Sequence, residues 1–218
     1  MDSTTKTPTS DVTIYENDYD GDGIFSKSIF TSIYDSKGNL IESSYTSDDN
    51  GDGITDSQSI TTNVYNNSDK LTQSVFKYDF DGDGIFDKAT TINTYDSNNH
   101  LIESVYTVDN NEDGSIDSQT SEVYTYDSKG NRVQSVRTED YDGDGTLDKT
   151  TVTNTYDDNG NLTETTSITD SKSDGSIDYK STTKNVYDCK DNLTQSVFEL
   201  DNNNDDKPDV KTTTTNTY

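Results

Sequence analysis

Residues 79–87 read Asp79-Phe80-Asp81-Gly82-Asp83-Gly84-Ile85-Phe86-Asp87, an aspartate-rich loop of the form D-x-[DN]-x-D-G-x-x-D. Seven versions of this loop, numbered here first to seventh, recur every 30 or 31 residues and open at Asp18, Asp48, Asp79, Asp109, Asp140, Asp170 and Asp201. A fixed period of this length is typical of repeat architectures, in which each repeat is one supersecondary unit. The repeat therefore decides the fold, and function has to be inferred from it.

The residue types of the loop fit a calcium site. Side-chain oxygens at loop positions 1, 3, 5 and 9 and a main-chain carbonyl at position 7 are ligands that calcium takes, and Gly at position 6 permits the sharp turn. Magnesium prefers small octahedral sites that keep several waters, and zinc prefers His or Cys. Position 12 is Ile, Ser or Thr, so the bidentate Glu of an EF-hand is missing and the loops are only EF-hand-like. The predicted ligands are Asp18, Asp20, Asp22 and Ile24; Asp48, Asn50, Asp52, Ile54 and Asp56; Asp79, Asp81, Asp83, Ile85 and Asp87; Asp109, Asn111, Asp113, Ser115 and Asp117; Asp140, Asp142, Asp144, Thr146 and Asp148; Asp170, Asp174 and Asp178; and Asp201, Asn203, Asp205 and Asp209.

The seven loops are not equivalent. The third and fifth are complete, and the first lacks only the closing aspartate, so these three are expected to bind calcium best. The second and fourth carry Asn at position 3 and lose one charge. The sixth has Lys172 at that position, and the seventh has Asp206 in place of the glycine. We expect five calcium sites and leave the sixth and seventh open.

The composition explains why ions would matter. Hydrophobic residues make up 26% of the 218 residues, Trp is absent and the net charge is -27, which is typical of a disordered chain. Each bound ion removes two negative charges, and a ligand at 100 times its dissociation constant stabilises the folded state by about 2.7 kcal/mol. We therefore expect a chain that is folded in calcium and loosened without it.

A second turn alternates with the aspartate loops. It begins at a tyrosine, is clearest as Tyr34-Asp-Ser-Lys-Gly-Asn-Leu40, and recurs at residues 65–71, 95–101, 126–132, 156–162 and 187–193. Four residues after each tyrosine stands a residue that tolerates a left-handed backbone: Gly38, Asp69, Asn99, Gly130, Gly160 or Asp191. This pattern predicts a hairpin built on a type I turn closed by a left-handed residue.

The segments between the turns are about ten residues long and rich in Thr, Tyr, Val and Ile, as strands are. The predicted fold is all-β, an antiparallel meander of about 14 strands built from seven repeats of about 30 residues, forming an open spiral or solenoid-like sheet; a closed barrel or a propeller is the alternative. Residues 1–10 are expected to be a disordered lead-in, and residues 11–218 a single calcium-binding domain. The aromatic row Tyr45, Phe76, Tyr106 and Phe198 is expected to be a packed face, with an exposed ladder as the alternative.

The spacing from loop aspartate to hairpin tyrosine alternates between 16 and 17 residues, which makes the true unit about 61 residues. We assign this difference of one residue to the strand between the loop and the hairpin. Either a β-bulge accommodates the extra residue, or the side chains beyond it point to the opposite face of the sheet.

The Tyr-Asp-x-x-Gly-Asn-Leu turns at 34–40 and 156–162 resemble the YD repeats of RHS-type bacterial surface and secreted proteins, whose hairpins assemble into spiral β-sheets. The aspartate loops are similar to those of thrombospondin type 3, dockerin and FG-GAP repeats, which bind calcium. The resemblance to YD proteins covers only the hairpin half of six repeats, and the calcium loop at every other turn departs from it. Together these resemblances imply a repeat protein of a secreted or cell-surface type.

The location expected from the residues is the calcium-rich bacterial exterior. The single cysteine, Cys189, excludes an internal disulfide, and no signal peptide or transmembrane segment is recognised, so we expect part of a longer or non-classically exported protein. The acidity argues against nucleic acid as a partner, and no membrane insertion is expected. Self-association through the end strands is a further expectation.

An enzymatic function is not expected, because the only histidine, His100, lies in a hairpin turn without a nucleophile motif beside it. The preferred function is structural: an adhesin segment, stalk or filament subunit whose fold is locked by calcium. The alternative is a calcium-dependent carbohydrate- or surface-binding module, which would have a glycan or cell-surface ligand.

Overall fold

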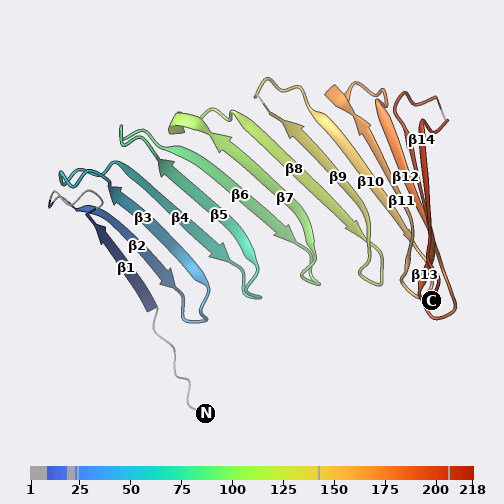
Figure 1. Cartoon of the computed structure of the whole chain (residues 1–218), viewed down its shortest axis with the longest axis horizontal. Helices are drawn as coiled ribbons and strands as arrows, with labels where there is room; N and C mark the ends of the chain where they lie inside the picture. The colour runs from blue at the N-terminus through green and yellow to red at the C-terminus, as the bar shows by residue number, and fades with distance from the viewer. Residues whose placement is uncertain (1–8, 19–22, 24, 142, 206) are drawn as a thin grey trace, which may run out of the picture. The chain divides into compact units, whose positions relative to one another are not determined.

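The computed structural model describes residues 9–18, 23, 25–141, 143–205 and 207–218. Over these residues the chain forms 14 strands that lie in chain order in one open antiparallel sheet (Figure 1). The meander predicted from the repeat is therefore confirmed, and the sheet is open rather than closed. The strands are β1 (Thr9–Asn17), β2 (Ser26–Tyr34), β3 (Leu40–Asp48), β4 (Ser57–Tyr65), β5 (Leu71–Asp79), β6 (Asp87–Tyr95), β7 (Leu101–Asp109), β8 (Ser118–Tyr126), β9 (Arg132–Asp140), β10 (Asp148–Tyr156), β11 (Leu162–Asp170), β12 (Tyr179–Tyr187), β13 (Leu193–Asp201) and β14 (Val210–Thr215).

The chain divides into two compact units. The first contains residues 1–94 and 105–117, and the second contains residues 95–104 and 118–218. Each unit has the same plan, with aspartate loops joining strands at one end and tyrosine hairpins joining them at the other (Figure 1). β1 begins at Thr9, so the strand starts before the boundary expected at residue 11. No described helix is long and apolar enough to cross a bilayer.

The tightest packing lies at the aspartate loops and not in a hydrophobic core. Among the described residues, Ala89 is the one buried hydrophobic side chain, at 9% exposure. The other buried residues are polar, and each stands at the opening aspartate of a loop or one residue before it: Ser47, Asp79, Asp109, Thr169 and Asp201. A sheet normally gains its stability by packing against a second layer. In this single layer, the buried polar residues lie instead at the turns.

The tyrosine hairpins form as the sequence predicts. In the first of them the N–H of Gly38 donates to the carbonyl of Asp35 at 3.1 Å, and Gly38 has a φ of 94°. The Asp35 side chain accepts hydrogen bonds from the N–H groups of Lys37 and Asn39 at 2.8 and 2.9 Å, which fixes the turn locally. All six residues predicted to be left-handed have positive φ, including the non-glycines Asp69, Asn99 and Asp191.

Neighbouring hairpins are joined by an Asn-x-Tyr motif that was not predicted from the sequence. Near the end of β4, the amide of Asn63 and the hydroxyl of Tyr65 both donate to the carbonyl of Leu40, at 3.0 and 3.1 Å. Asn154 with Tyr156, and Asn185 with Tyr187, repeat this arrangement on the carbonyls of Arg132 and Leu162. These side chains satisfy a backbone acceptor at the point where strand pairing ends.

The extra residue of alternate repeats lies in the aspartate loop. The strands that follow the loops, such as β4 and β6, have nine residues in both kinds of repeat. Across the second loop Ser47 pairs with Ser57, whereas across the third Tyr78 pairs with Asp87, so the second loop encloses one residue more. The N–H of Asp56 also donates to the carbonyl of Ser47 at 2.8 Å, which accommodates the extra residue before the ladder begins. Placing the variation inside a strand was therefore wrong, and the facing of the side chains does not change.

Candidate metal centres

The opening aspartate of each loop organises the turn that follows it. In the third loop Asp79 ends β5, and its carboxylate accepts the N–H groups of Gly82 and Gly84 at 2.8 and 3.1 Å. Gly84 has a φ of 86°, which a residue with a Cβ adopts only at a cost. The N–H of Ile85 donates to Asp83 at 2.8 Å. The loop is therefore wound around its own carboxylates.

The same bond recurs along the chain. The N–H of the glycine at position 6 donates to the opening aspartate in the first six loops, at distances of 3.1 Å for Gly23–Asp18, 2.9 Å for Gly53–Asp48, 3.1 Å for Gly84–Asp79, 3.3 Å for Gly114–Asp109, 3.0 Å for Gly145–Asp140 and 3.1 Å for Gly175–Asp170. The six loops thus share one local geometry between positions 1 and 6.

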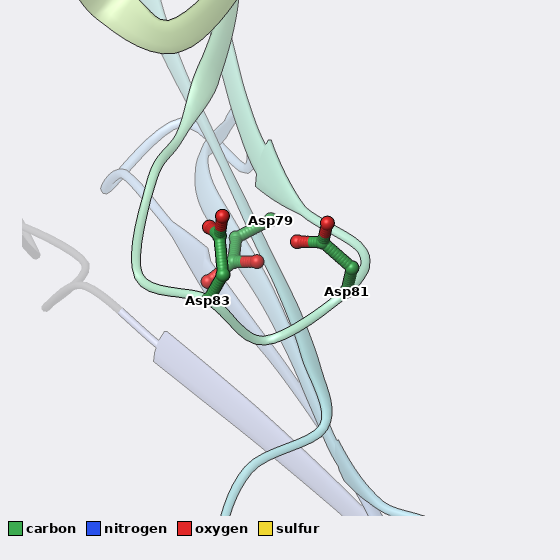
Figure 2. Close-up of side chains that lie close together, drawn as sticks. All are labelled: Asp79, Asp81 and Asp83. Carbon is green, nitrogen blue, oxygen red and sulfur yellow. The ribbon is translucent and has the colours of Figure 1, made fainter.

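In the third loop three carboxylates converge. One oxygen each from Asp79, Asp81 and Asp83 lies within 4.8 Å of the others, and the described residues hold no second such group of His, Cys, Asp or Glu. Figure 2 shows the three side chains turned toward one another, with Asp79 at the strand end and the other two in the loop. They line a hollow of about 260 Å³ whose wall also includes Asp87 and Asn111. Three acidic oxygens around an open space are a donor set suited to a hard cation.

The electrostatics of Asp79 favour its charged form. Burial alone would raise the pKa of this carboxyl, since only 2% of the residue is exposed. The hydrogen bonds that it accepts from the Gln58 side chain and from the N–H groups of Gly82 and Gly84 outweigh burial, and the pKa is lowered from 3.8. The carboxylate is therefore ionised at neutral pH and available to a cation.

The closing aspartates, at position 9, form hydrogen bonds that hold the loops in place. Among the described residues they do not belong to a cluster with the side chains of positions 1, 3 and 5. In the four longer loops the side chain at position 9 accepts the N–H of position 2 in its own loop: Asp56 from Asp49 at 2.7 Å, Asp117 from Asn110 at 2.6 Å, Asp178 from Ser171 at 2.6 Å and Asp209 from Asn202 at 2.8 Å. In the third and fifth loops it accepts from the next loop instead, Asp87 from Asn111 at 2.9 Å and Asp148 from Lys172 at 3.0 Å. The aspartate at position 9 therefore bonds within its own loop when the loop is long, and to the next loop when the loop is short.

The fourth and sixth loops differ from the third in the backbone at position 3, which is left-handed, whereas position 4 is left-handed in all three. Asn111 and Glu112 have φ values of 63° and 46°, and Lys172 and Ser173 have 72° and 48°. The complete third loop has glycine, Gly82, at position 4, with a φ of 70°. Asp174 in the sixth loop has a lowered pKa, mainly because of hydrogen bonds from Ser176, with a smaller contribution from the charge of Lys172. The positive charge of Lys172 thus contributes to lowering the pKa of a carboxylate in this loop.

Several predicted ligands lie outside the described residues. These are Asp20, Asp22 and Ile24 of the first loop and Asp142 of the fifth; Asp206 of the seventh is also outside. In the seventh loop Asp205 donates its N–H to Asp201 at 3.3 Å, and the N–H of Lys207 donates to Asp205 at 2.9 Å. Apart from the third loop, the described side chains of these loops are not gathered into one cluster.

Two residues near the third loop were not recognised from the sequence. Gln58, from the neighbouring strand β4, donates its amide to Asp79 at 3.4 Å. Asn111 was assigned to the fourth loop, and it lines the hollow of the third. The loop sequence alone predicts neither the hydrogen bond of Gln58 nor the place of Asn111, because both depend on the register between adjacent repeats.

His100 is held as a turn residue. Its N–H donates to Asp96 at 2.9 Å, and its ring Nδ1 lies 3.1 Å from the other oxygen of the same carboxylate. Asn39 makes the equivalent pair of bonds to Asp35 in the first hairpin. The His100 ring also stacks on Tyr126, with 4.8 Å between centroids.

No protein-family model matches the chain, and no curated protein is similar to it in sequence. Among solved structures, the chain is similar to the crystal structure of a porin-like protein from Bacteroides uniformis, with a TM-score of 0.37 and 12% sequence identity. The alignment covers 96% of this chain and 95% of the other. At this TM-score the likeness identifies neither a family nor a function.

Proposed function

We propose that this chain is a calcium-binding structural β-repeat protein whose fold is locked by the ions. The observation that carries the proposal is the convergence of Asp79, Asp81 and Asp83 on one hollow, in a loop pattern that recurs seven times in the sequence. Three ionised carboxylates repel one another when no cation is present. A calcium ion bound among them would convert that repulsion into attraction.

The structure supports a mechanical role for the ion. The opening aspartate ends one strand, and the loop leads directly into the next, so an ion held by positions 1, 3 and 5 would fix the end of the first strand to the loop that leads to the second. Because buried residues gather at the loops while hydrophobic burial is confined to Ala89 among the described residues, the loops are where added binding energy would most affect folding. A ligand that binds only the folded chain stabilises it in proportion to site occupancy.

The biological setting that we propose is a bacterial cell surface or secreted assembly, in which the chain forms an adhesin segment, stalk or filament subunit. Loops of this kind bind weakly enough to require a calcium-rich exterior, as in other extracellular modules. Bound ions would also reduce the electrostatic repulsion that a net charge of -27 causes within the folded chain.

Calorimetric titration with calcium tests the site directly. Asp81→Asn removes one charge from the cluster, and Asp158→Asn removes the same charge from a hairpin turn away from any aspartate loop. We expect Asp81→Asn to lose one binding site or to weaken it at least about tenfold, which corresponds to about 1.4 kcal/mol. Equal titration curves for Asp81→Asn and Asp158→Asn would refute the assignment of the third loop as a calcium site.

One observation favours the alternative of a carbohydrate-binding module. The second unit has a hollow of about 400 Å³ at its hairpin end, lined by Tyr124, Tyr126 and His100 together with Asp96 and Asp127. Aromatic faces beside carboxylates can stack on a sugar ring and accept its hydroxyl groups. Glycan-array binding that requires calcium and is lost in Tyr126→Ala would support this function over a purely structural one.

A further inference from the structure

The sheet of the first unit has one face with almost no charge. Paired residues share a face, and the strand registers pair Phe30 with Tyr45, Thr61 with Phe76, and Phe76 with Ala89. Tyr78 stands two residues after Phe76 and therefore points the same way. We call this surface the aromatic face, and it is defined by Phe30, Tyr45, Thr61, Phe76, Tyr78 and Ala89.

Charged side chains of β2 to β6 point to the opposite face with one exception. The exception is Asp87, which pairs with Tyr78 at the mouth of the third loop. In a chain with 27% charged residues, such a separation across five strands indicates a surface that has to be free of charge. The residues on the charged face are Lys27, Glu42, Asp48, Lys77, Asp79 and Lys88.

The aromatic face has no second layer over it within the described residues. Phe30 is 44% exposed, although its ring lies 4.7 Å from that of Tyr45, and the Phe76 and Tyr78 rings lie 5.1 Å apart. Tyr45, Phe76 and Tyr78 are half-buried by their neighbours in the same sheet, and such a cluster is the start of a core that lacks its other half. Such exposed patches mark interaction surfaces.

The aromatic face has a surface shape that can fit a second copy of itself. Tyr45 on β3 and Phe76 on β5 rise on either side of β4, which presents only Ser59 and Thr61 between them. Next to β5, β6 presents the small Ala89. With strands about 4.8 Å apart, β4 and β6 form small-residue furrows beside the aromatic ridges of β3 and β5. A copy shifted by one strand would place its ridges in these furrows, as facing sheets do in a sandwich.

The size and charge of the face fit a second copy of this chain. Five strands of nine residues, at about 4.8 Å spacing and about 3.3 Å rise, give a face of about 710 Å². A stable interface buries about 600–1,000 Å² on each partner. Association through the charged face would have to desolvate three lysines and three acidic residues, whereas the aromatic face of these strands carries only Asp87.

We propose that the aromatic face of one molecule packs against the aromatic face of a second molecule, making a two-layer sandwich with two-fold symmetry. Both partners present the same residues, so the contact closes on itself and stops at a dimer. The charged faces of the two sheets then point outward to solvent.

Neighbouring residues on β4 provide a matched test. Thr61 pairs with Phe76 on the aromatic face, and Thr62 pairs with Val75 on the charged face. In sedimentation equilibrium at millimolar calcium we expect a dimer for the wild type and for Thr62→Glu. Thr61→Glu should weaken the dimer at least about 100-fold, because it buries an unpaired carboxylate. A monomeric wild type, or equal weakening by both variants, would overturn the proposal.

Thiol protection keeps the test informative if Thr61→Glu does not fold. Cys189 is exposed and can be replaced by Ser, and Thr61→Cys or Thr62→Cys then supplies the one thiol. We expect maleimide labelling of Thr61→Cys to slow as the protein concentration rises through the dimerisation range. Labelling of Thr62→Cys should stay constant, and a rate for Thr61→Cys that does not depend on concentration would contradict the interface.

Discussion

The carboxylate of Asp87 accepts a hydrogen bond from the backbone N–H of Asn111 at 2.9 Å, which ties the third aspartate loop to the fourth. Asp148 and Lys172 make the equivalent bond at 3.0 Å between the fifth and sixth loops. The third and fourth loops and the fifth and sixth loops are therefore joined in pairs, which gives the 61-residue unit a physical meaning. A shorter loop offers its closing aspartate to the longer loop that follows it.

Removing the bond between the loops should loosen the pair. We expect Asp87→Ala to lower the thermal midpoint and to weaken calcium binding at the third loop, because Asp87 also lines its hollow. The control is Asp56→Ala, which breaks a bond within the second loop only. Differential scanning calorimetry with calorimetric titration would measure both, and a larger loss of third-loop affinity in Asp56→Ala would count against the pairing.

Close approach of the second and third loops predicts a difference between two glycines. A Cβ at Gly82 would lie 2.8 Å from the carbonyl oxygen of Asp56, whereas a Cβ at Gly84 would meet nothing within 4 Å. Both glycines have positive φ, so Ala costs about 1–2 kcal/mol at either position. Gly82→Ala should lower the free energy of unfolding by about 1–3 kcal/mol more than Gly84→Ala. Urea denaturation at saturating calcium measures the difference, and equal losses would show that the loops are not in contact.

The tyrosine that reaches the previous hairpin should contribute to stability through its hydroxyl. Tyr65→Phe removes the bond to the Leu40 carbonyl and should cost about 1 kcal/mol in the free energy of unfolding. Tyr179→Phe is the control, because Tyr179 is 42% exposed and its hydroxyl makes no hydrogen bond within the described part of the chain. Equal stability of the two variants would mean that the hairpins are held together by other contacts.

The sixth loop should gain a site when its third position is restored. Lys172→Asp replaces an ammonium with the carboxylate that the pattern requires, and Lys172→Ala removes the ammonium without adding a ligand. We expect the calcium stoichiometry to rise by one in Lys172→Asp and to stay unchanged in Lys172→Ala. If the two variants bind the same number of ions, the backbone of this loop and not its third residue decides occupancy.

The hairpins should lose stability in acid. Hydrogen bonds from the side chains of Asn39, Asn131 and Asn192 are the main reason that the pKa values of Asp35, Asp127 and Asp188 lie below 3.8. Because these pKa values are lower in the folded chain than in the unfolded chain, the stabilisation is complete above the unfolded value and is lost as pH falls through the folded value.

We therefore expect Asn192→Ala to reduce the acid dependence of the free energy of unfolding below about pH 4. The carboxylates of the aspartate loops are common to both proteins and cancel in the comparison. Denaturation series from neutral to acid pH would measure it, and parallel curves for wild type and variant would contradict the expectation.

The sequence predicted those features whose forces act within a few residues. The hairpin at Tyr34 could be predicted because Asp35 bonds to residues two and four positions further along. The convergence of Asp79, Asp81 and Asp83 follows in the same way from the turn that Gly82 and Gly84 allow.

Features that depend on adjacent repeats could not be predicted. Asp87 finds its partner Asn111 across a complete hairpin, and Gln58 reaches Asp79 from a neighbouring strand. The extra residue of the longer loops was wrongly placed in a strand. Its position in the loop depends on the hydrogen bond between Asp56 and Ser47, which joins the ends of two different strands. The Asn63-x-Tyr65 motif is the exception, since its recurrence could have been noticed in the sequence alone.

The most direct test of calcium as the lock of this fold is the thermal unfolding of the wild-type chain, followed by far-ultraviolet circular dichroism in millimolar calcium and in excess chelator. Occupied loops add binding free energy to the folded state alone, so the account predicts a β-sheet spectrum with a cooperative transition in calcium and a strongly lowered midpoint, or no transition, in chelator. The same spectrum and the same midpoint in both solutions would contradict it.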